Sequence, residues 1–115
     1  MAVSLKFPIT KKIKSKKEIG LLLKKGTRWR CDHFTLVFKK NTLYFDRMAV
    51  LVSKKIGSAH TRNYVKRIFR EIFRQTILVD PPYFDIVICP KKPITVKFGQ
   101  LKQVYEKWRL KGKKS

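Results

Sequence analysis

The chain has 115 residues, with 29 Lys and Arg against 7 Asp and Glu, and its formal net charge is +22. This length accommodates one domain with a single modest core and excludes two, so we expect residues 1–115 to form a single domain. A hydrophobic content of 43% and an aromatic content of 12% favour a folded chain over a disordered basic one. So much positive charge opposes compaction unless a polyanion is close.

The sequence shows neither a targeting signal nor a pattern of cysteines that indicates a disulfide or a metal site. No apolar run approaches the roughly 20 residues of a membrane-spanning helix, and residues 1–8 lack the apolar core of a secretion signal. We therefore expect a cytoplasmic protein. Cys31 and Cys89 are far apart in the sequence and are expected to be reduced structural thiols. A metal site is not expected, because His33 and His60 do not supply further ligands at zinc-binding spacing.

The first predicted elements are a basic arm over residues 1–14 and a short helix. Ser15 and Glu18 have the spacing of a capping box, with Ser15 as the N-cap, and Gly26 stands where a helix would end. A helix is therefore predicted from about Lys16 to Lys25. Because it is too short to be stable alone, it must be held by packing. The apolar residues on its one face are Ile19, Leu22 and Leu23.

Strands follow this helix. Residues 34–38 alternate large apolar with smaller side chains, and residues 39–42 are turn-like. Residues 48–53 are predicted to pair with residues 34–38 in antiparallel fashion, and residues 28–31 could form a short edge strand. On this alternation, Phe34, Leu36 and Phe38 face the helices, whereas Thr35, Val37 and Leu51 face the other way.

A long amphipathic helix is predicted to begin at Arg62. At about 100° per residue, its apolar side chains and its cations fall on opposite arcs. The apolar arc consists of Tyr64, Val65, Ile68, Phe69, Ile72 and Phe73. Cations one turn apart repel by roughly 0.2–0.5 kcal/mol per pair, and Glu71 is the one acid in the helix. An external polyanion would offset this repulsion. A solvated basic face is the alternative, although the usual alternation of Glu and Lys is missing.

The last third of the chain supplies a strand and a helix. Asp80, Pro81 and Pro82 are predicted to end the long helix, because proline cannot continue it. Residues 83–89 form a continuous apolar run of strand length, which indicates a central strand. A closing amphipathic helix is predicted from apolar residues at helical spacing. These residues are Phe98, Leu101, Val104, Tyr105 and Trp108.

The order helix, two or three strands, helix, strand and helix predicts an α+β fold with a small layered sheet. Its globular core is expected to span residues 15–110, followed by a basic tail at residues 111–115.

The acidic residues do not form a catalytic set. Hydrolysis of a phosphodiester by protein groups normally requires acids that bind two metals, or a histidine base beside a cationic clamp. Here the acids are single and scattered over different predicted elements, and Asp32 with His33 is the only close pair of an acid and a histidine. His60 is isolated. We therefore expect no catalytic residue in this chain.

One stretch, residues 53–74, carries many specific positions close together. They are Ser53, Lys54, Lys55, Ile56, Gly57, Ala59, Arg62, Asn63, Lys66, Arg67, Arg70, Glu71, Phe73 and Arg74. This pattern, a lysine pair and a glycine that lead into an Arg-Asn helix, resembles the signature of the protein subunit of bacterial ribonuclease P. Tyr64 stands where that family usually has a second arginine.

The resemblance extends over residues 13–108 and implies the order αβββαβα, with a mixed sheet packed against helices and a left-handed β-α-β crossover. Periodicity could not indicate this crossover, because the general rule favours the right hand. The resemblance also implies an endoribonuclease that removes the 5′ leader of precursor tRNA. By the same resemblance, its RNA subunit is expected to perform hydrolysis with bound Mg²⁺. The protein binds that RNA and the leader, lowers the Mg²⁺ requirement, binds no cofactor itself and needs no protein partner.

Two sets of site residues follow from the resemblance. The residues expected to contact RNA phosphates are Lys54, Lys55, Arg62, Asn63, Lys66, Arg67, Arg70 and Arg74. The residues expected to line a cleft for the single-stranded leader are Ile19, Leu23, Phe34, Val37 and Leu51. The family often has phenylalanines where Ile19 and Leu23 stand, and the alternative for these two residues is that they simply pack in the core. Aliphatic side chains lose part of the stacking energy, which is roughly 1–3 kcal/mol per base.

Two other classes of protein fit the composition. A ribosomal protein or another basic RNA-packing module shares the charge and the size, but has no reason to reproduce the pattern at residues 53–74. A basic helix on a membrane surface is disfavoured by the aromatic and β-branched strands, which indicate a globular domain.

Overall fold

The computed structural model describes residues 12, 13, 15–76, 81–93 and 97–111. The chain forms three α-helices, a four-stranded sheet and one short 3₁₀ turn within these residues. In order they are α1 (Lys16–Lys25), β1 (Thr27–Arg30), β2 (Phe34–Lys40), β3 (Arg47–Val50), η2 (Lys54–Ile56), α2 (Ala59–Gln75), β4 (Phe84–Pro90) and α3 (Phe98–Lys111). The predicted α+β class and the order αβββαβα are confirmed.

The strand order in the sheet is β1-β2-β4-β3. β4 pairs antiparallel with β2 and parallel with β3, so the predicted antiparallel pairing of residues 48–53 with residues 34–38 is wrong. The physical reason lies in β4, where Phe84, Ile86, Val87 and Ile88 are all buried. A strand that is apolar on both faces is most stable between two neighbours, and α2 provides the long connection that a parallel neighbour needs.

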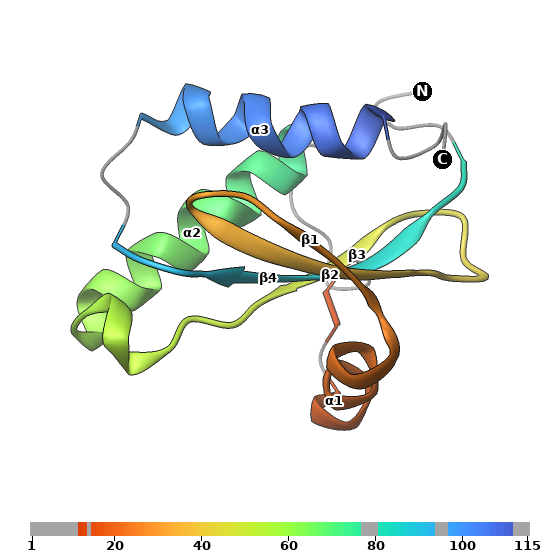
Figure 1. Ribbon diagram of the computed structural model, residues 1–115, viewed down its shortest axis with the longest axis horizontal. Helices are drawn as coiled ribbons and strands as arrows, with labels where there is room; N and C mark the ends of the chain where they lie inside the picture. Colours follow the sequence, from red (N-terminus) through yellow and green to blue (C-terminus); the bar gives the residue numbers. More distant parts are fainter. Residues whose placement is uncertain (1–11, 14, 77–80, 94–96, 112–115) are drawn as a thin grey trace, which may run out of the picture.

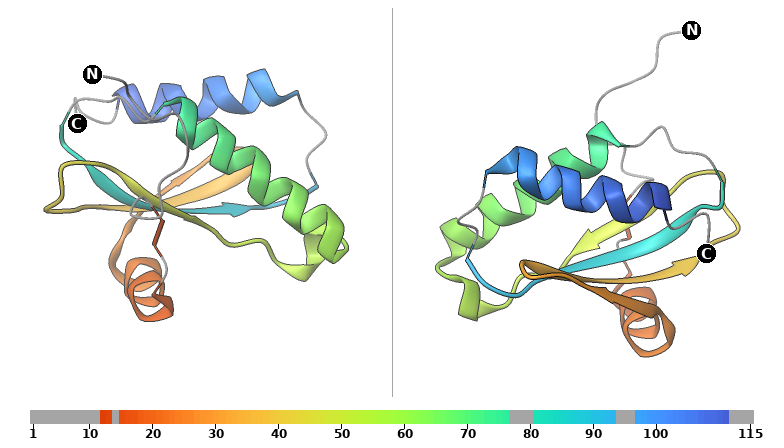
Figure 2. Two further views of the ribbon diagram at one scale, coloured as in Figure 1. Left: turned by 180° about the vertical axis from the view of Figure 1, so that it is seen from behind. Right: turned by 45° about the horizontal axis from the view of Figure 1, so that its top comes forward.

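The sheet separates two unequal layers. α2 and α3 lie together on one face, and α1 lies alone on the other (Figure 1). The connection from β3 through α2 to β4 is the left-handed crossover that the resemblance implied (Figure 2). Because α1 contacts β2 and β4, it leaves the edge strand β3 uncovered on its side of the sheet.

The core is divided by the sheet in the same way. The larger cluster lies under α2 and α3, where the rings of Phe34 and Phe69 meet edge to face at 5.2 Å. The smaller cluster lies under α1 and consists of Ile13, Leu22, Val37 and Val87. Ile13 is 5% exposed, and its N–H donates to the Met48 carbonyl at 3.1 Å. The predicted arm over residues 1–14 is therefore wrong at Ile13, which belongs to the core; residues 1–11 and 14 lie outside the described residues.

The helix α1 has the predicted bounds, because its two ends are signalled locally. The Ser15 hydroxyl accepts a hydrogen bond from the Glu18 N–H at 3.3 Å, and the Gly26 N–H donates to the Leu22 carbonyl at 2.7 Å. The Glu18 carboxylate does not complete the capping box as predicted. It accepts a hydrogen bond from Arg47 instead.

The helix α2 begins at Ala59, three residues before the predicted Arg62. The Ser58 hydroxyl caps it by accepting a hydrogen bond from the Thr61 N–H at 3.3 Å. Gly57, at φ 150°, lets the chain turn from η2 into this cap. The helix ends at Gln75, where the Thr76 hydroxyl donates to the Ile72 carbonyl at 2.9 Å. The predicted stop at residues 80–82 is therefore wrong, and its Asp80 lies outside the described residues.

Gly20, in the middle of α1, and Gly26, at its C-cap, are expected to respond in opposite directions to replacement by alanine. A methyl group on Gly26 would lie 2.6 Å from the Leu22 carbonyl and 2.7 Å from the Val37 side chain, whereas Gly20 has nothing within 4 Å. We expect Gly26→Ala to lower the free energy of unfolding by about 1–2 kcal/mol, and Gly20→Ala to raise it by about 0.5–1 kcal/mol. Urea denaturation measures both. Equal effects would show that α1 does not pack closely at Gly26.

Candidate nucleic-acid interface

A groove runs along the edge strand β3, between α1 on one face of the sheet and α2 on the other. Two adjoining pockets, of about 160 and 410 Å³, share Val50 and Leu51 and together form what we term the β3 groove. The first pocket is lined by Lys12, Ile13, Ile19, Met48, Ala49, Val50, Leu51 and Arg70. The second is lined by Val50, Leu51, Val52, Ser53, Lys66, Cys89 and Pro90.

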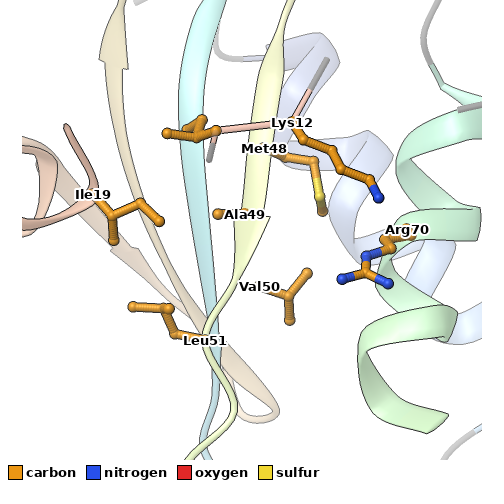
Figure 3. Close-up of a pocket in the computed structure, with 8 residues that line it drawn as sticks. Lys12, Ile19, Met48, Ala49, Val50, Leu51 and Arg70 are labelled. Carbon is orange, nitrogen blue, oxygen red and sulfur yellow. The ribbon is translucent and has the colours of Figure 1, made fainter. Parts of the chain in front are cut away.

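The lining residues divide by chemistry. Ile19 projects from α1 on one side, while the charged ends of Lys12 and Arg70 reach into the same space on the other side (Figure 3). Val50 and Leu51 lie between the two sides (Figure 3). No acidic residue is among those that line either pocket within the described chain. The groove therefore combines an apolar floor with a cationic wall, which is how proteins hold single-stranded nucleic acid.

The helix α2 presents its cations in two directions. Lys66 and Arg70 line the β3 groove. Asn63 and Arg67 are exposed on the outer side of the helix, and the predicted single row of cations is thus divided between groove and solvent. Arg62 is half-buried, and its Nε has no hydrogen-bond partner among the residues that the structure describes.

Comparison with known proteins supplies the family. The model of the family described as Ribonuclease P matches residues 7–112. The chain belongs to the ribonuclease P protein family. The ribonuclease P protein component of Thermotoga petrophila is 35% identical over 95 residues, which cover 83% of this chain and 81% of that protein. The component from Petrotoga mobilis is 32% identical and covers 80% and 78%, respectively.

Solved structures agree with this assignment. The ribonuclease P protein from Thermotoga maritima superposes with a TM-score of 0.73 at 32% identity, covering 80% of this chain and 88% of that one. The protein from Staphylococcus aureus superposes with a TM-score of 0.72 at 26% identity, covering 84% and 90%. The chain is thus a ribonuclease P protein subunit involved in tRNA processing. Its partner is the ribonuclease P RNA, and the ribosomal alternative is not favoured.

The five residues predicted to line the leader cleft of this ribonuclease P protein lie in different places in the structure. Ile19 and Leu51 both line the β3 groove. Leu23 packs against the smaller core cluster and is not among the lining residues of the groove. Val37 is fully buried beneath α1, and Phe34 is fully buried on the opposite face of the sheet. Val37 and Phe34 are therefore wrong as cleft residues.

Phe34 is buried because it lies on the face of β2 that packs against α2. The error at Val37 comes from the place of β4. In the predicted sheet β2 would be next to β3, and the face of β2 that carries Val37 would form the floor of the cleft. Because β4 lies between them, α1 covers Val37 and Val87, and the open floor moves to the edge strand. Its residues Ala49 and Val50, and Lys12 beside them, were not predicted. Lys12 reaches this position through a bridge to Met48 that no local sequence signal indicates.

Arg74 differs from the other predicted phosphate contacts of the ribonuclease P protein. Its side chain is paired with Glu71, which lies one turn earlier in α2. Hydrogen bonds from Arg74, and secondarily from Gln75, lower the pKa of Glu71 to about 2. The carboxylate is therefore ionised at neutral pH, and it offsets the charge of Arg74. Lys54 and Lys55, by contrast, are exposed in η2 directly after the groove residue Ser53.

Tyr64 falls on the apolar arc of α2, but the sequence leaves open whether it packs inward or contacts a base, and the structure shows that it does not pack inward. Its side chain is 55% exposed, because the buried stripe of α2 is narrower than the predicted arc. That stripe consists of Val65, Phe69, Ile72 and Phe73. Tyr64 therefore lies in solvent next to Asn63, on the outer side of the helix.

The described residues offer little else that bears on chemistry. They contain no group of three or more His, Cys, Asp or Glu side chains that could hold a metal ion. Cys31 and Cys89 are free thiols, and burial raises the pKa of Cys89. No helix in this part of the chain combines the length and apolar character needed to cross a bilayer.

Proposed function

We propose that this subunit holds the single-stranded 5′ leader of precursor tRNA in the β3 groove while the outer side of α2 docks on the catalytic RNA. The observation that carries the proposal is the composition of the groove. Apolar side chains at Ile19, Val50 and Leu51 can contact bases or riboses, and Lys66 and Arg70 can bind the phosphates between them.

The two surfaces are adjacent because α2 contributes to both. Arg67 and Asn63 face outward, whereas Arg70 faces the groove. A catalytic RNA bound to the outer side of α2 would thus lie beside a leader bound in the groove. Cations between two polyanions reduce their mutual repulsion, which is how the protein would lower the Mg²⁺ requirement of the reaction.

The endoribonuclease step itself is proposed to belong to the RNA and its Mg²⁺ ions. Support comes from the protein's own acids, most of which are engaged in ion pairs. Asp46 pairs with Arg109, Glu71 with Arg74, and both Asp85 and Glu18 with Arg47. Carboxylates committed in this way are poor ligands for catalytic metals. The chain then binds and orients RNA, and it requires no cofactor of its own.

The experiment that tests the proposal is cleavage of precursor tRNA at low Mg²⁺ by a bacterial ribonuclease P RNA, with and without this protein. We expect the protein to stimulate cleavage at the mature 5′ end and to be inactive alone. Binding assays should show tighter association with leader-bearing tRNA than with mature tRNA. Stimulation without any preference for the leader would contradict the role given to the β3 groove.

The exposed Tyr64 is expected to stack on an unpaired base of the catalytic RNA. Tyr64→Ala should weaken RNA binding by about 1 kcal/mol, because stacking is lost. It should leave the slope of log affinity against log salt unchanged, because no phosphate contact is lost. Arg67→Ala should reduce that slope by roughly 0.7–0.9. Filter binding at several salt concentrations measures both, with Tyr64→Phe as the matched control. A changed slope for Tyr64→Ala would contradict stacking.

A further inference from the structure

An ion-pair network links α1 to the sheet at the start of β3. The Arg47 guanidinium binds Asp85 through two hydrogen bonds, Nε to Oδ1 at 2.9 Å and Nη2 to Oδ2 at 2.7 Å. The same Nη2 donates to Oε2 of Glu18 at 2.8 Å. Arg47 and Asp85 are directly opposite each other in the parallel pairing of β3 and β4. Arg47 thus holds one carboxylate from the sheet and one from α1.

The sheet side of this network is rigid. Asn41 donates to Asp85 Oδ1 at 3.0 Å and to the Phe45 carbonyl at 3.1 Å, which ties the turn between β2 and β3 to the same carboxylate. The Arg47 side chain is 20% exposed and the Asp85 side chain 22%. A bidentate guanidinium with two fixed partners has little rotational freedom. Arg47 therefore presents Nη2 to α1 from a defined position.

The α1 side of the network adjoins the β3 groove. Glu18 immediately precedes Ile19, the residue with which α1 lines the groove. Leu22 packs in the cluster that contains Val37 and Val87, so the apolar contacts of α1 hold it over β2 and β4. The bond from Glu18 to Arg47 instead ties the first turn of α1 directly to β3. It thereby constrains the separation between Ile19 and the groove floor at Ala49 and Leu51.

We infer that Glu18, held by Arg47, is a positioning residue that sets the width of the β3 groove and thereby the preference of the subunit for leader-bearing tRNA. This inference rests on the proposed function. The pair contributes little to overall stability, because the Glu18 side chain is 50% exposed and exposed pairs are weak. Its effect is therefore expected in the shape of the groove, with the fold preserved.

A positioning role and a purely electrostatic role of Glu18 predict different changes in RNA affinity. Glu18→Ala removes a negative charge, so electrostatics alone predicts tighter binding of every RNA. Positioning predicts that the ratio of affinities for precursor over mature tRNA falls, by roughly threefold to tenfold, measured with the reconstituted ribonucleoprotein. Glu106→Ala, on α3 at the other face of the sheet, makes the same charge change and should leave the ratio unaltered.

Two further variants keep the test decisive. Glu18→Gln can still accept the hydrogen bond from Arg47 and should retain most of the ratio, whereas Arg47→Lys cannot span both carboxylates and should lower it. Hydrogen exchange of the α1 amides checks that the helix remains folded. If the wild type clearly prefers leader-bearing tRNA and Glu18→Ala keeps the same ratio of affinities for precursor over mature tRNA, the inference about Glu18 is overturned and the proposed function stands. A wild type without that preference would overturn the proposed function and this inference with it.

Discussion

Arg67→Glu is expected to weaken assembly with the catalytic RNA by roughly 100-fold, or about 3 kcal/mol, without changing the circular dichroism spectrum. Arg67 is exposed on the outer side of α2, so its side chain contributes little to the core. Replacement by a carboxylate removes a contact to phosphate and adds a repulsive one. The slope of log affinity against log salt should fall by about 1.

The matched control for this substitution is Lys107→Glu. Lys107 is exposed on α3 and undergoes the same change of two charge units. If the net charge of the protein determined binding, both variants would lose affinity equally. If α2 is the docking surface, only Arg67→Glu loses most of it. A collapsed circular dichroism spectrum for Arg67→Glu would show that this residue is structural, contrary to the exposure of its side chain.

Asp46→Ala is expected to lower the free energy of unfolding by about 3–5 kcal/mol, a large part of the 5–15 kcal/mol typical of a domain. Asp46 is 3% exposed, and its carboxylate accepts hydrogen bonds from Arg109 Nε at 2.7 Å, from Arg109 Nη2 at 3.2 Å and from the Phe84 N–H at 2.8 Å. Without Asp46, the buried guanidinium of Arg109 loses the carboxylate with which it pairs, and the buried Phe84 N–H loses its acceptor.

The surroundings of Arg109 explain why this loss cannot be relieved by water. Arg109 is 1% exposed, its Nη2 also donates to the Pro82 carbonyl at 2.8 Å, and its guanidinium lies 5.1 Å from the centre of the Phe84 ring. Denaturation with guanidinium chloride measures the loss in the free energy of unfolding of Asp46→Ala. The control is Asp32→Ala, which removes an exposed carboxylate and should change stability by less than about 0.5 kcal/mol.

A double-mutant cycle separates the pair from its components. Arg109→Met alone leaves the buried Asp46 carboxylate with the Phe84 N–H as its one hydrogen-bond donor within the described part of the chain, and it should also be strongly destabilising. The double variant Asp46→Ala with Arg109→Met should be less destabilised than the sum of the single variants, because no buried charge remains. Additive losses would contradict direct coupling of the two residues.

Features that depend on neighbouring residues in the chain were predicted well. α1 has the predicted bounds because Ser15 and Gly26 act on backbone groups within one turn of themselves. The central place of β4 was predicted because a strand buried on both faces must be apolar throughout. The ribonuclease P signature at residues 53–74 was recognisable for the same reason, since most of its positions fall on one helix and the turn before it.

Features that depend on distant pairs were predicted poorly or not at all. The ion pair of Asp46 and Arg109, and the network of Glu18, Arg47 and Asp85, join residues that no periodicity relates. The exposure of Tyr64 could not be decided from the sequence, because a helical wheel gives the direction of a side chain but not the width of the surface that covers it.

The sequence by itself determined the family, the α+β class, the order of the elements and the cationic helix, because each depends on local signals or on composition. Only the tertiary structure decided where the groove lies. Insertion of β4 between β2 and β3 buried Val37 under α1 and left β3 as the open floor. Strand order depends on the free energy of closing the long connections between strands, whereas the hydrophobic pattern within each strand is compatible with several orders.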